Sequence, residues 1–262
     1  MLILAALLTI AEPVGPPPCT GVTPRVDVLG PGPSESNVPL NTRIWMRAEG
    51  LSAEHIQVQL REAPGDAPLV AGNTDLYVVR DPFASRVLES GVEGRLPQLL
   101  KPNTMYLLEW SAPRNGLSGG HVFITGATVD DTPPLPAVAA GAAQGTTAID
   151  CDAAIGLQID VGGFDAESLL HVASIDGAGR GIGRGTQLFA FVGAPGVMAV
   201  GEIDTFDLAG NRAADALTFA GTTTSRPFEP AQPTGCSTSG APGLAAIALL
   251  QAVRMLRAMT KR

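Results

Sequence analysis

The sequence predicts an all-β protein built from two tandem β-sandwich domains. Its 262 residues are enough for two domains of about 100 residues each, with tails at both ends. The 31 Gly and 22 Pro, together with only 16% charged residues, are typical of many short strands joined by tight turns. The third observation is that apolar and polar residues alternate with period two in both halves of the chain, as in 105–110 and 155–161.

Residues 1–11 form an apolar run with the length of a signal-peptide core, and Thr9 and Ala11 are small enough for a cleavage site at its end. The alternative is a short buried strand. Residues 12–21 form a Pro-rich linker, because consecutive prolines cannot continue a helix or join a central strand. The sequence therefore predicts export after removal of residues 1–11.

The first sandwich domain is predicted to span 22–128. Turn residues recur every 10 to 15 positions or so, a spacing that fits a sandwich. The strands expected from alternation are 26–28, 43–48, 56–61, 76–79, 86–88, 105–110 and 121–125.

A tyrosine begins one of these strands. Tyr106 follows the Leu100-Lys101-Pro102 turn and alternates with Leu108 and Trp110. Such a tyrosine is typical of the tyrosine corner of immunoglobulin-like sandwiches, in which the ring packs inward and the hydroxyl bonds to backbone a few residues upstream. We therefore expect Tyr106 and Trp110 to have structural roles in the core of the first domain.

Two segments resemble a known family. Asn37–Ile44 and Leu100–Tyr106 look like the corresponding motifs of bacterial immunoglobulin-like domains of the SbsA type. The resemblance implies a spacer or adhesive module of a secreted or cell-surface protein, without catalytic residues.

Residues 129–136 form the linker to the second domain, and their prolines favour an extended, semi-rigid segment. The second domain is predicted at 137–223. Its expected strands are 155–161, 188–192, 197–206 and 216–219. Asp207–Asn211 is similar to the Asp-x-x-Gly-Asn turn of bacterial immunoglobulin-like and fibronectin type III-like domains, with structural roles for Asp207 and Asn211.

The C-terminal part is predicted to be a stalk and an anchor. Residues 224–243 are rich in Thr, Ser, Pro and Gly, and 244–262 form an apolar helix with a basic end. Cys236, the spacer after it and the basic end are similar to the MYXO-CTERM sorting tail, which implies processing at Cys236 and retention at the cell surface. The alternative is an amphipathic helix docked on a sandwich.

Charge and cysteine usage exclude several classes of function. The net charge of −8 repels phosphate backbones, so nucleic acid is not an expected partner. Cys19, Cys151 and Cys236 match no metal-ligand spacing; Cys19 and Cys151 are the more plausible disulfide pair, and isolated thiols are the alternative. Neither a metal nor a cofactor is predicted.

Three motifs that could carry chemistry are interpreted as structural. Residues 116–120 match Gly-x-Ser-x-Gly, but they precede a strand and read as a hairpin turn. Residues 177–185 have alternating glycines, but they lack the spacing and the following helix of a dinucleotide-binding motif. They are interpreted as a mobile loop whose Arg180 and Arg184 could contact an anionic partner. Two aspartate pairs could bind calcium, namely Asp150 with Asp152 and Asp204 with Asp207. They are interpreted as solvated carboxylates in turns.

Arg43, Trp45 and Arg47 form the candidate binding face, because they alternate with the apolar residues Ile44 and Met46. If they face water, they suit an acidic polysaccharide or a carboxylate-bearing loop of an extracellular protein. The alternative is cation–π packing on the sheet, or a reversed face.

The predicted function is that of a non-enzymatic cell-surface protein that presents or spaces a binding face and is held to the membrane by its tail. One alternative is an accessory or inhibitory module for an extracellular hydrolase. Another is a secreted serine hydrolase that uses Ser118 and His121.

Overall fold

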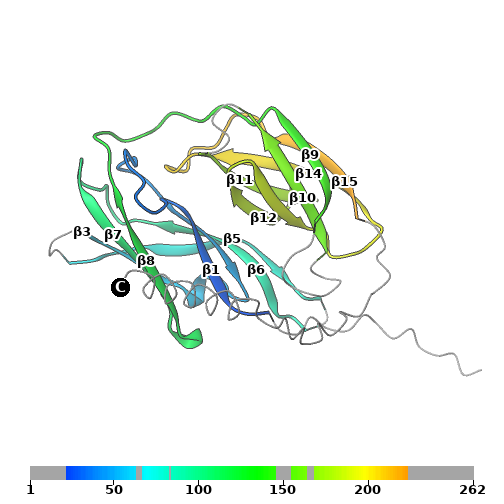
Figure 1. Cartoon of the computed structure of the whole chain (residues 1–262), viewed down its shortest axis with the longest axis horizontal. Coiled ribbons are helices and arrows are strands. Elements are labelled where there is room, and N and C mark those ends of the chain that lie inside the picture. The colour runs from blue at the N-terminus through cyan, green and yellow to red at the C-terminus, as the bar shows by residue number, and fades with distance from the viewer. Residues whose placement is uncertain (1–21, 63–66, 83, 146–154, 164–167, 224–262) are drawn as a thin grey trace, which may run out of the picture. The chain divides into compact units, whose positions relative to one another are not determined.

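The computed structural model describes residues 22–62, 67–82, 84–145, 155–163 and 168–223 (Figure 1). Within these ranges the regular elements are strands and two 3-10 turns, so the predicted all-β class is confirmed. No helix of the described residues is long and apolar enough to cross a membrane. The predicted signal peptide, the three cysteines, the stalk and the anchor helix lie outside the described residues.

The first sandwich consists of two antiparallel sheets of four strands each, in the orders β1-β2-β6-β5 and β4-β3-β7-β8. The first sheet contains β1 (Arg25–Gly30), β2 (Ile44–Glu49), β5 (Gly72–Arg80) and β6 (Val87–Arg95). The second contains β3 (Gln57–Glu62), β4 (Leu69–Val70), β7 (Met105–Ala112) and β8 (Leu117–Ile124). This is the A-B-E-D and C-F-G order of the immunoglobulin fold, with β4 as a short extra strand beside C.

The chain between β1 and β2 crosses from one sheet to the other. The Ser34 N–H donates to the Val122 carbonyl (2.8 Å), and Val38 forms a parallel bridge with Thr125. This segment covers the C-terminal half of the edge strand β8, where unpaired backbone groups would otherwise be open to pairing with another chain.

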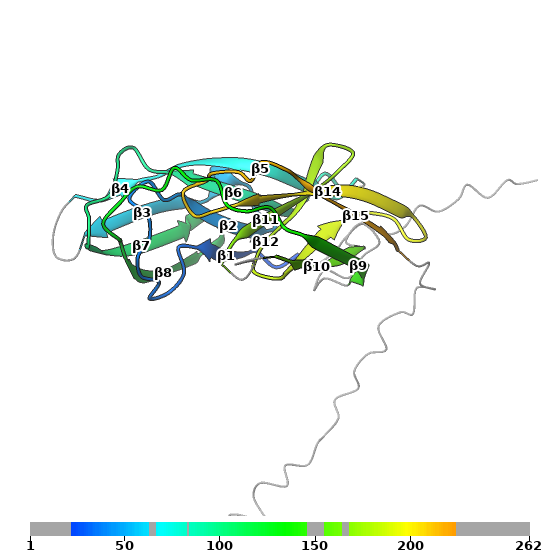
Figure 2. The same cartoon turned by 90° about the horizontal axis from the view of Figure 1, so that it is seen from above.

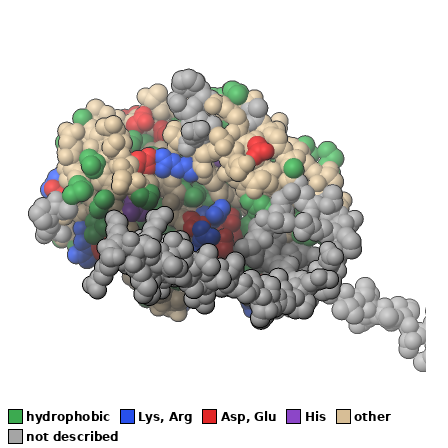
Figure 3. All heavy atoms as spheres, in the orientation of Figure 1, with side chains coloured by type: hydrophobic (Ala, Val, Ile, Leu, Met, Phe, Trp, Pro, Cys, Tyr) green, Lys and Arg blue, Asp and Glu red, His purple; other side chains and the backbone are tan. Residues whose placement is uncertain are grey.

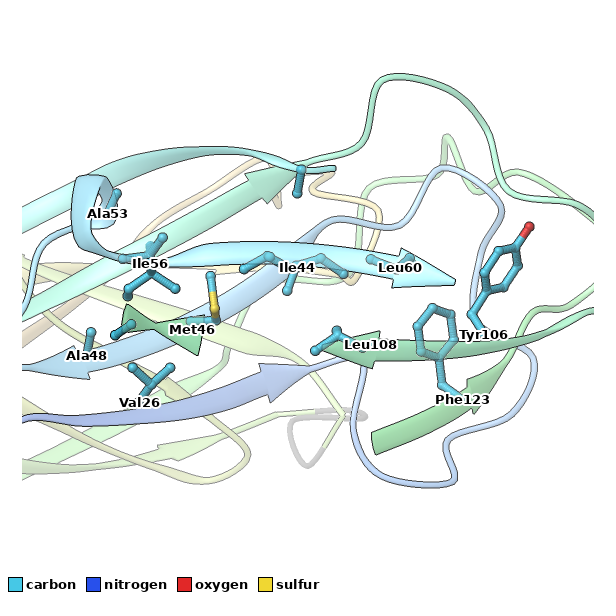
Figure 4. Close-up of a cluster of buried hydrophobic side chains, with 14 of the residues drawn as sticks. Val26, Ile44, Met46, Ala48, Ala53, Ile56, Leu60, Tyr106, Leu108 and Phe123 are labelled. Carbon is cyan, nitrogen blue, oxygen red and sulfur yellow. The ribbon is translucent and has the colours of Figure 1, made fainter. Parts of the chain in front are cut away.

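The core of the first sandwich lies between its two sheets (Figure 4). Ile44, Met46 and Leu108 are fully buried there, as their alternation predicts. Trp110 is only half-buried and packs against this core from its rim. Its ring lies over Gly119, where an added Cβ would come within 2.7 Å of the indole, so the cross-strand neighbour of Trp110 has to be glycine.

Tyr106 has the geometry of a tyrosine corner. Its hydroxyl accepts a hydrogen bond from the Lys101 backbone N–H (3.0 Å), and its ring stacks on Phe123 with centroids 5.9 Å apart. Tyr106→Phe is expected to lower the free energy of unfolding by about 1 kcal/mol, because the Lys101 N–H loses its acceptor while the ring keeps its packing. Urea unfolding measures this change. A Tyr106→Phe curve that coincides with the wild-type curve would show that the corner adds no stability.

The second sandwich has the same arrangement with one strand fewer. Its sheets have the orders β13-β10-β9 and β12-β11-β14-β15. The first contains β9 (Ala139–Gly145), β10 (Gly156–Gly162) and β13 (Gln187–Phe191). The second contains β11 (Leu170–Ile175), β12 (Ala178–Arg184), β14 (Met198–Phe206) and β15 (Leu217–Thr222). Figure 2 shows β14 and β15 side by side. Leu157, Ile159 and Phe219 belong to the core between these sheets.

Residues 177–185 are not a loop, contrary to the sequence interpretation, because Ala178–Arg184 forms β12. Its glycines are needed for close packing against β13. A Cβ at Gly181 would lie 1.8 Å from the Phe189 carbonyl oxygen, and one at Gly183 would lie 2.7 Å from the Gln187 carbonyl oxygen. The alternating glycines therefore mark a strand that another strand approaches closely.

The Asp-x-x-Gly-Asn turn follows β14 and has the form that its residues predict. Asp207 accepts a hydrogen bond from the Asn211 backbone N–H through Oδ1 (2.9 Å) and one from the Asn211 side-chain amide through Oδ2 (2.8 Å). Gly210 has a φ of +86°, in the left-handed region that glycine tolerates best.

Candidate functional site

Trp45 is buried, so the predicted exposed binding face is wrong. Its side chain is 1% exposed, its ring centroid lies 5.5 Å from that of Phe206, and its indole N–H donates to the Leu208 carbonyl (3.4 Å). The predicted alternation is correct, since Trp45 points away from the first core. What covers it is the second sandwich, in a cluster that also contains Leu170, Ile182 and Phe191. We call this cluster, together with the hydrogen bonds and the ion pair that link the two sandwiches around it, the joint.

The two arginines beside Trp45 pair with carboxylates of their own sandwich. Arg43 bonds to the buried Glu93, and Arg47 bonds to Asp27 (2.9 Å). Burial alone would lower the pKa of Arg47, but hydrogen bonding to Asp27 and nearby carboxylates outweigh it and raise the pKa. Both guanidiniums therefore bind carboxylates of this chain, and the tryptophan between them is covered.

Hydrogen bonds to the Leu208 carbonyl connect the Asp207–Asn211 turn to the first sandwich. Besides Trp45, it accepts hydrogen bonds from the Arg43 backbone N–H (2.8 Å) and the Thr42 hydroxyl (3.2 Å). Gly210 has a second role here, because a Cβ at this position would lie 2.2 Å from the Arg43 side chain. The turn predicted as a local feature of one domain is therefore also a contact between two.

The linker is held from both sides at Asp130. Its carbonyl accepts side-chain amide hydrogen bonds from Asn41 of the first sandwich (2.9 Å) and from Asn211 of the second (2.8 Å). The Asp130 N–H in turn donates to Asn41 Oδ1 (2.9 Å). Burial raises the pKa of Asp207, next to this contact, although hydrogen bonds from Asn211 oppose the rise.

A bidentate ion pair also links the two sandwiches at the joint. The Arg184 guanidinium on β12 bonds to both oxygens of Glu35 (2.8 and 2.6 Å) and to the Leu29 carbonyl (3.1 Å). Burial raises the pKa of Glu35, but the hydrogen bonds from Arg184 and Gly32 outweigh it and lower the pKa overall. Arg184, a predicted contact for an anionic partner, binds a carboxylate of its own chain.

Glu89 is a buried carboxyl within the joint. It is 5% exposed and accepts a hydrogen bond from the Tyr77 hydroxyl (2.7 Å). Burial raises the pKa of Glu89 to about 7, against the opposing effects of the Tyr77 hydrogen bond and the charge of Arg47. Burial and the adjacent Glu89 also raise the pKa of Tyr77.

The Gly-x-Ser-x-Gly segment lacks the geometry of a nucleophile. Gly116 ends a 3-10 turn (Pro113–Asn115) with a φ of +68°, and Ser118 then lies within β8 rather than at a strand-to-helix elbow. Ser118 and His121 are three residues apart on one strand and so point to opposite faces. The His121 ring is within hydrogen-bond distance of the Pro31 carbonyl, with Nε2 at 2.7 Å.

The aspartates considered for calcium make internal bonds in the described part of the chain. Asp204 bonds to Arg212 (3.0 Å), and Asp207 holds Asn211. Asp150 and Asp152 lie outside the described residues. On the face shown in Figure 3, described basic side chains lie beside acidic ones.

A groove of about 760 Å³ lies on the sheet β4-β3-β7-β8, and the 3-10 turn Ala53–His55 and Asn73 of β5 complete its lining. Cross-strand register places two rows of its lining on the outer face of the sheet. Gln57, Ser111 and Ser118 make one row across β3, β7 and β8. The second row is Gln59, Glu109 and Gly120. Ser118 and Gly120 have little or no side chain, so they leave room above β8.

The groove has a mixed polar and apolar lining, which includes Val70, Leu107 and Trp110, and its ionisable side chains are acidic. Its lining includes the carboxylates of Glu54 and Glu109 and, among the described residues, no Lys, Arg or His. Glu109 is held in place by Arg61 (2.8 Å) and by the Gln59 amide (3.0 Å). Sequence alternation identified β3 as a strand with one polar face, but it could not show that this face is hollowed.

The strand order and the tyrosine corner define the fold as an immunoglobulin- or fibronectin III-like β-sandwich. No family model matches the chain, and no curated protein matches it. Among solved structures, the chain is similar to the fibronectin(III)-like modules of CbhA from Clostridium thermocellum, with 11% sequence identity and a TM-score of 0.22. That match covers 76% of this chain and 94% of the other. A score this low adds nothing to the argument from strand order.

Proposed function

We propose that this chain is a non-enzymatic surface protein in which two fused sandwiches act as a stiff spacer and present the groove on β4-β3-β7-β8 to an extracellular partner. The observation that carries the proposal is the joint. A buried aromatic cluster, the Leu208 carbonyl contacts and the Arg184–Glu35 pair hold the two sandwiches together. Flexible tandem domains would need none of these contacts.

The placement of the groove supports presentation. It lies on the sheet of the first sandwich that does not take part in the joint, since the joint uses the outer face of β1-β2-β6-β5. The second sandwich therefore leaves the groove open. Extracellular display is also what the SbsA-type resemblance implies.

The proposed location depends on both ends of the chain. Residues 1–11 would direct export, and residues 224–262 would hold the protein at the envelope after processing at Cys236, as the similarity to the MYXO-CTERM tail implies. Two sandwiches on a Thr-, Ser- and Pro-rich stalk would then stand away from the membrane.

Cell fractionation tests this location. The full chain is expected in the envelope fraction without residues 1–11, and Cys236→Ser is expected to release it to the medium or to leave it unprocessed. The matched control is Ser237→Ala, which changes the neighbouring residue and keeps the cysteine. A cytoplasmic wild-type protein would refute the proposal, and an unchanged mass and location in Cys236→Ser would remove the role of the cysteine.

A further inference from the structure

We propose that the groove on β4-β3-β7-β8 is a binding site for a neutral glycan chain. The inference rests on the proposed function only for its extracellular setting. The groove is a different surface from the face at Arg43, Trp45 and Arg47, where Trp45 is buried, and its expected ligand is neutral instead of acidic.

The groups that line the groove suit polyhydroxylated ligands. The Gln57 side chain carries two N–H donors and a carbonyl acceptor, and Gln59 keeps one N–H and its carbonyl beside its bond to Glu109. The Ser111 and Ser118 hydroxyls each donate and accept. Sugar hydroxyls also do both, so neighbouring pairs of them can be matched by such groups. Two rows about 7 Å apart along the strands, on strands about 4.8 Å apart, offer several such contacts at once.

Charge selects against an acidic ligand. The only ionisable groups in the described lining are the carboxylates Glu54 and Glu109, so the lining offers no cation of its own to a uronate, sulfate or phosphate, and Glu54 would repel it. The guanidinium of Arg61 already bonds to Glu109 (2.8 Å). A neutral chain meets no such repulsion, and its binding needs no counter-charge.

Backbone pairing selects against an extended peptide. The central strand β7 pairs with β3 and β8 along its length, and β3 pairs with β4 at Gln59 and Leu60. An added peptide strand therefore finds no free ladder over β7, although main-chain bonds give such complexes most of their affinity. Recognition over this strand has to use side chains. The groove volume of about 760 Å³ is within the range of sites for small ligands or short chain segments.

The test is calorimetric titration of the purified protein with two soluble neutral glucans, dextran and laminarin, and with polygalacturonate as the acidic comparator. The wild type is expected to bind a neutral glucan with an affinity that changes less than twofold between roughly 50 and 500 mM NaCl, and to bind polygalacturonate at least tenfold more weakly. Failure to bind either glucan, or tighter binding of polygalacturonate, would overturn the proposal.

Two variants tie the binding to the groove. The double variant Gln57→Ala and Gln59→Ala removes amide contacts, and Ser118→Phe fills the space above β8; each is expected to weaken binding by about tenfold or more. The matched control is Thr218→Phe, a change at an exposed position on β15 of the second sandwich. The thermal midpoints show whether each variant is folded. Unchanged affinity in both folded groove variants would place the glucan elsewhere.

The outcomes also separate this inference from the proposed function. If the wild type binds no neutral glucan but Ser118→Phe still abolishes attachment to envelope material, the groove has a protein partner and only the glycan proposal fails. If the wild type binds a glucan but is found in the cytoplasm, the surface role fails and the site stands.

Discussion

Trp45→Ala is expected to lower the free energy of unfolding by about 3–5 kcal/mol, the range for truncating a large buried aromatic. The side chain is 1% exposed and packs on Phe206 across the joint, so its removal leaves a cavity that two facing sheets cannot easily close. It also removes one of the donors to the Leu208 carbonyl. A loss of this size is a large part of the stability of an ordinary domain.

Calorimetry and urea unfolding measure this effect, with Val200→Ala as the control. Val200 lies on β14 of the second sandwich and is 55% exposed, so its truncation is expected to change stability by less than about 0.5 kcal/mol. We also expect the Trp45→Ala protein to unfold in two transitions instead of one, because the sandwiches lose a shared contact. A midpoint equal to that of the wild type would mean that the joint does not hold in solution.

Raising the pH from about 4.5 to above 7 is expected to destabilise the protein by about 3 kcal/mol through Glu89 alone. Its pKa is about 7 in the folded protein against an ordinary value of 4.5, a difference of roughly 2.5 units at 1.36 kcal/mol each. Because the folded pKa is the higher one, the folded state binds the proton more tightly. Its contribution is complete below pH 4.5 and is lost as the pH rises through 7.

Glu89→Gln tests this expectation. The amide stays neutral and its carbonyl can still accept the Tyr77 hydroxyl, so the variant is expected to be more stable than the wild type at about pH 8 and to lose the slope between pH 4.5 and 7. Glu202→Gln is the control, because Glu202 is exposed on β14 and its removal leaves the joint unchanged. Equal slopes for wild type and Glu89→Gln would show that Glu89 is not buried in solution.

The sequence alone was sufficient for features determined by local chemistry. Alternation predicted that Ile44, Met46 and Leu108 face a core, because a strand turns successive side chains to opposite faces. The turn at Asp207–Asn211 was also predictable, since a glycine with positive φ and two short polar side chains can close it without help from elsewhere. Tyr106 could be assigned for the same reason, because its hydrogen-bond acceptor role involves the backbone only five residues upstream.

The strand β12 could not be recognised from its own residues. Gly179, Gly181 and Gly183 alternate in a stretch with few apolar side chains, which by itself resembles a loop. What makes it a strand is the close approach of β13 to Gly181 and Gly183, and that approach depends on residues of another strand.

Only the tertiary structure decided what each outer sheet face meets. Trp45 between two arginines has the composition of a binding face, and Gln57 and Gln59 have that of an ordinary solvated face. The structure shows the reverse: Trp45 is covered by the second sandwich, and the two glutamines line the groove. Period two assigns a side chain to one of two faces, but whether that face meets water or a second sheet depends on contacts between residues more than 160 positions apart, such as Trp45 with Leu208.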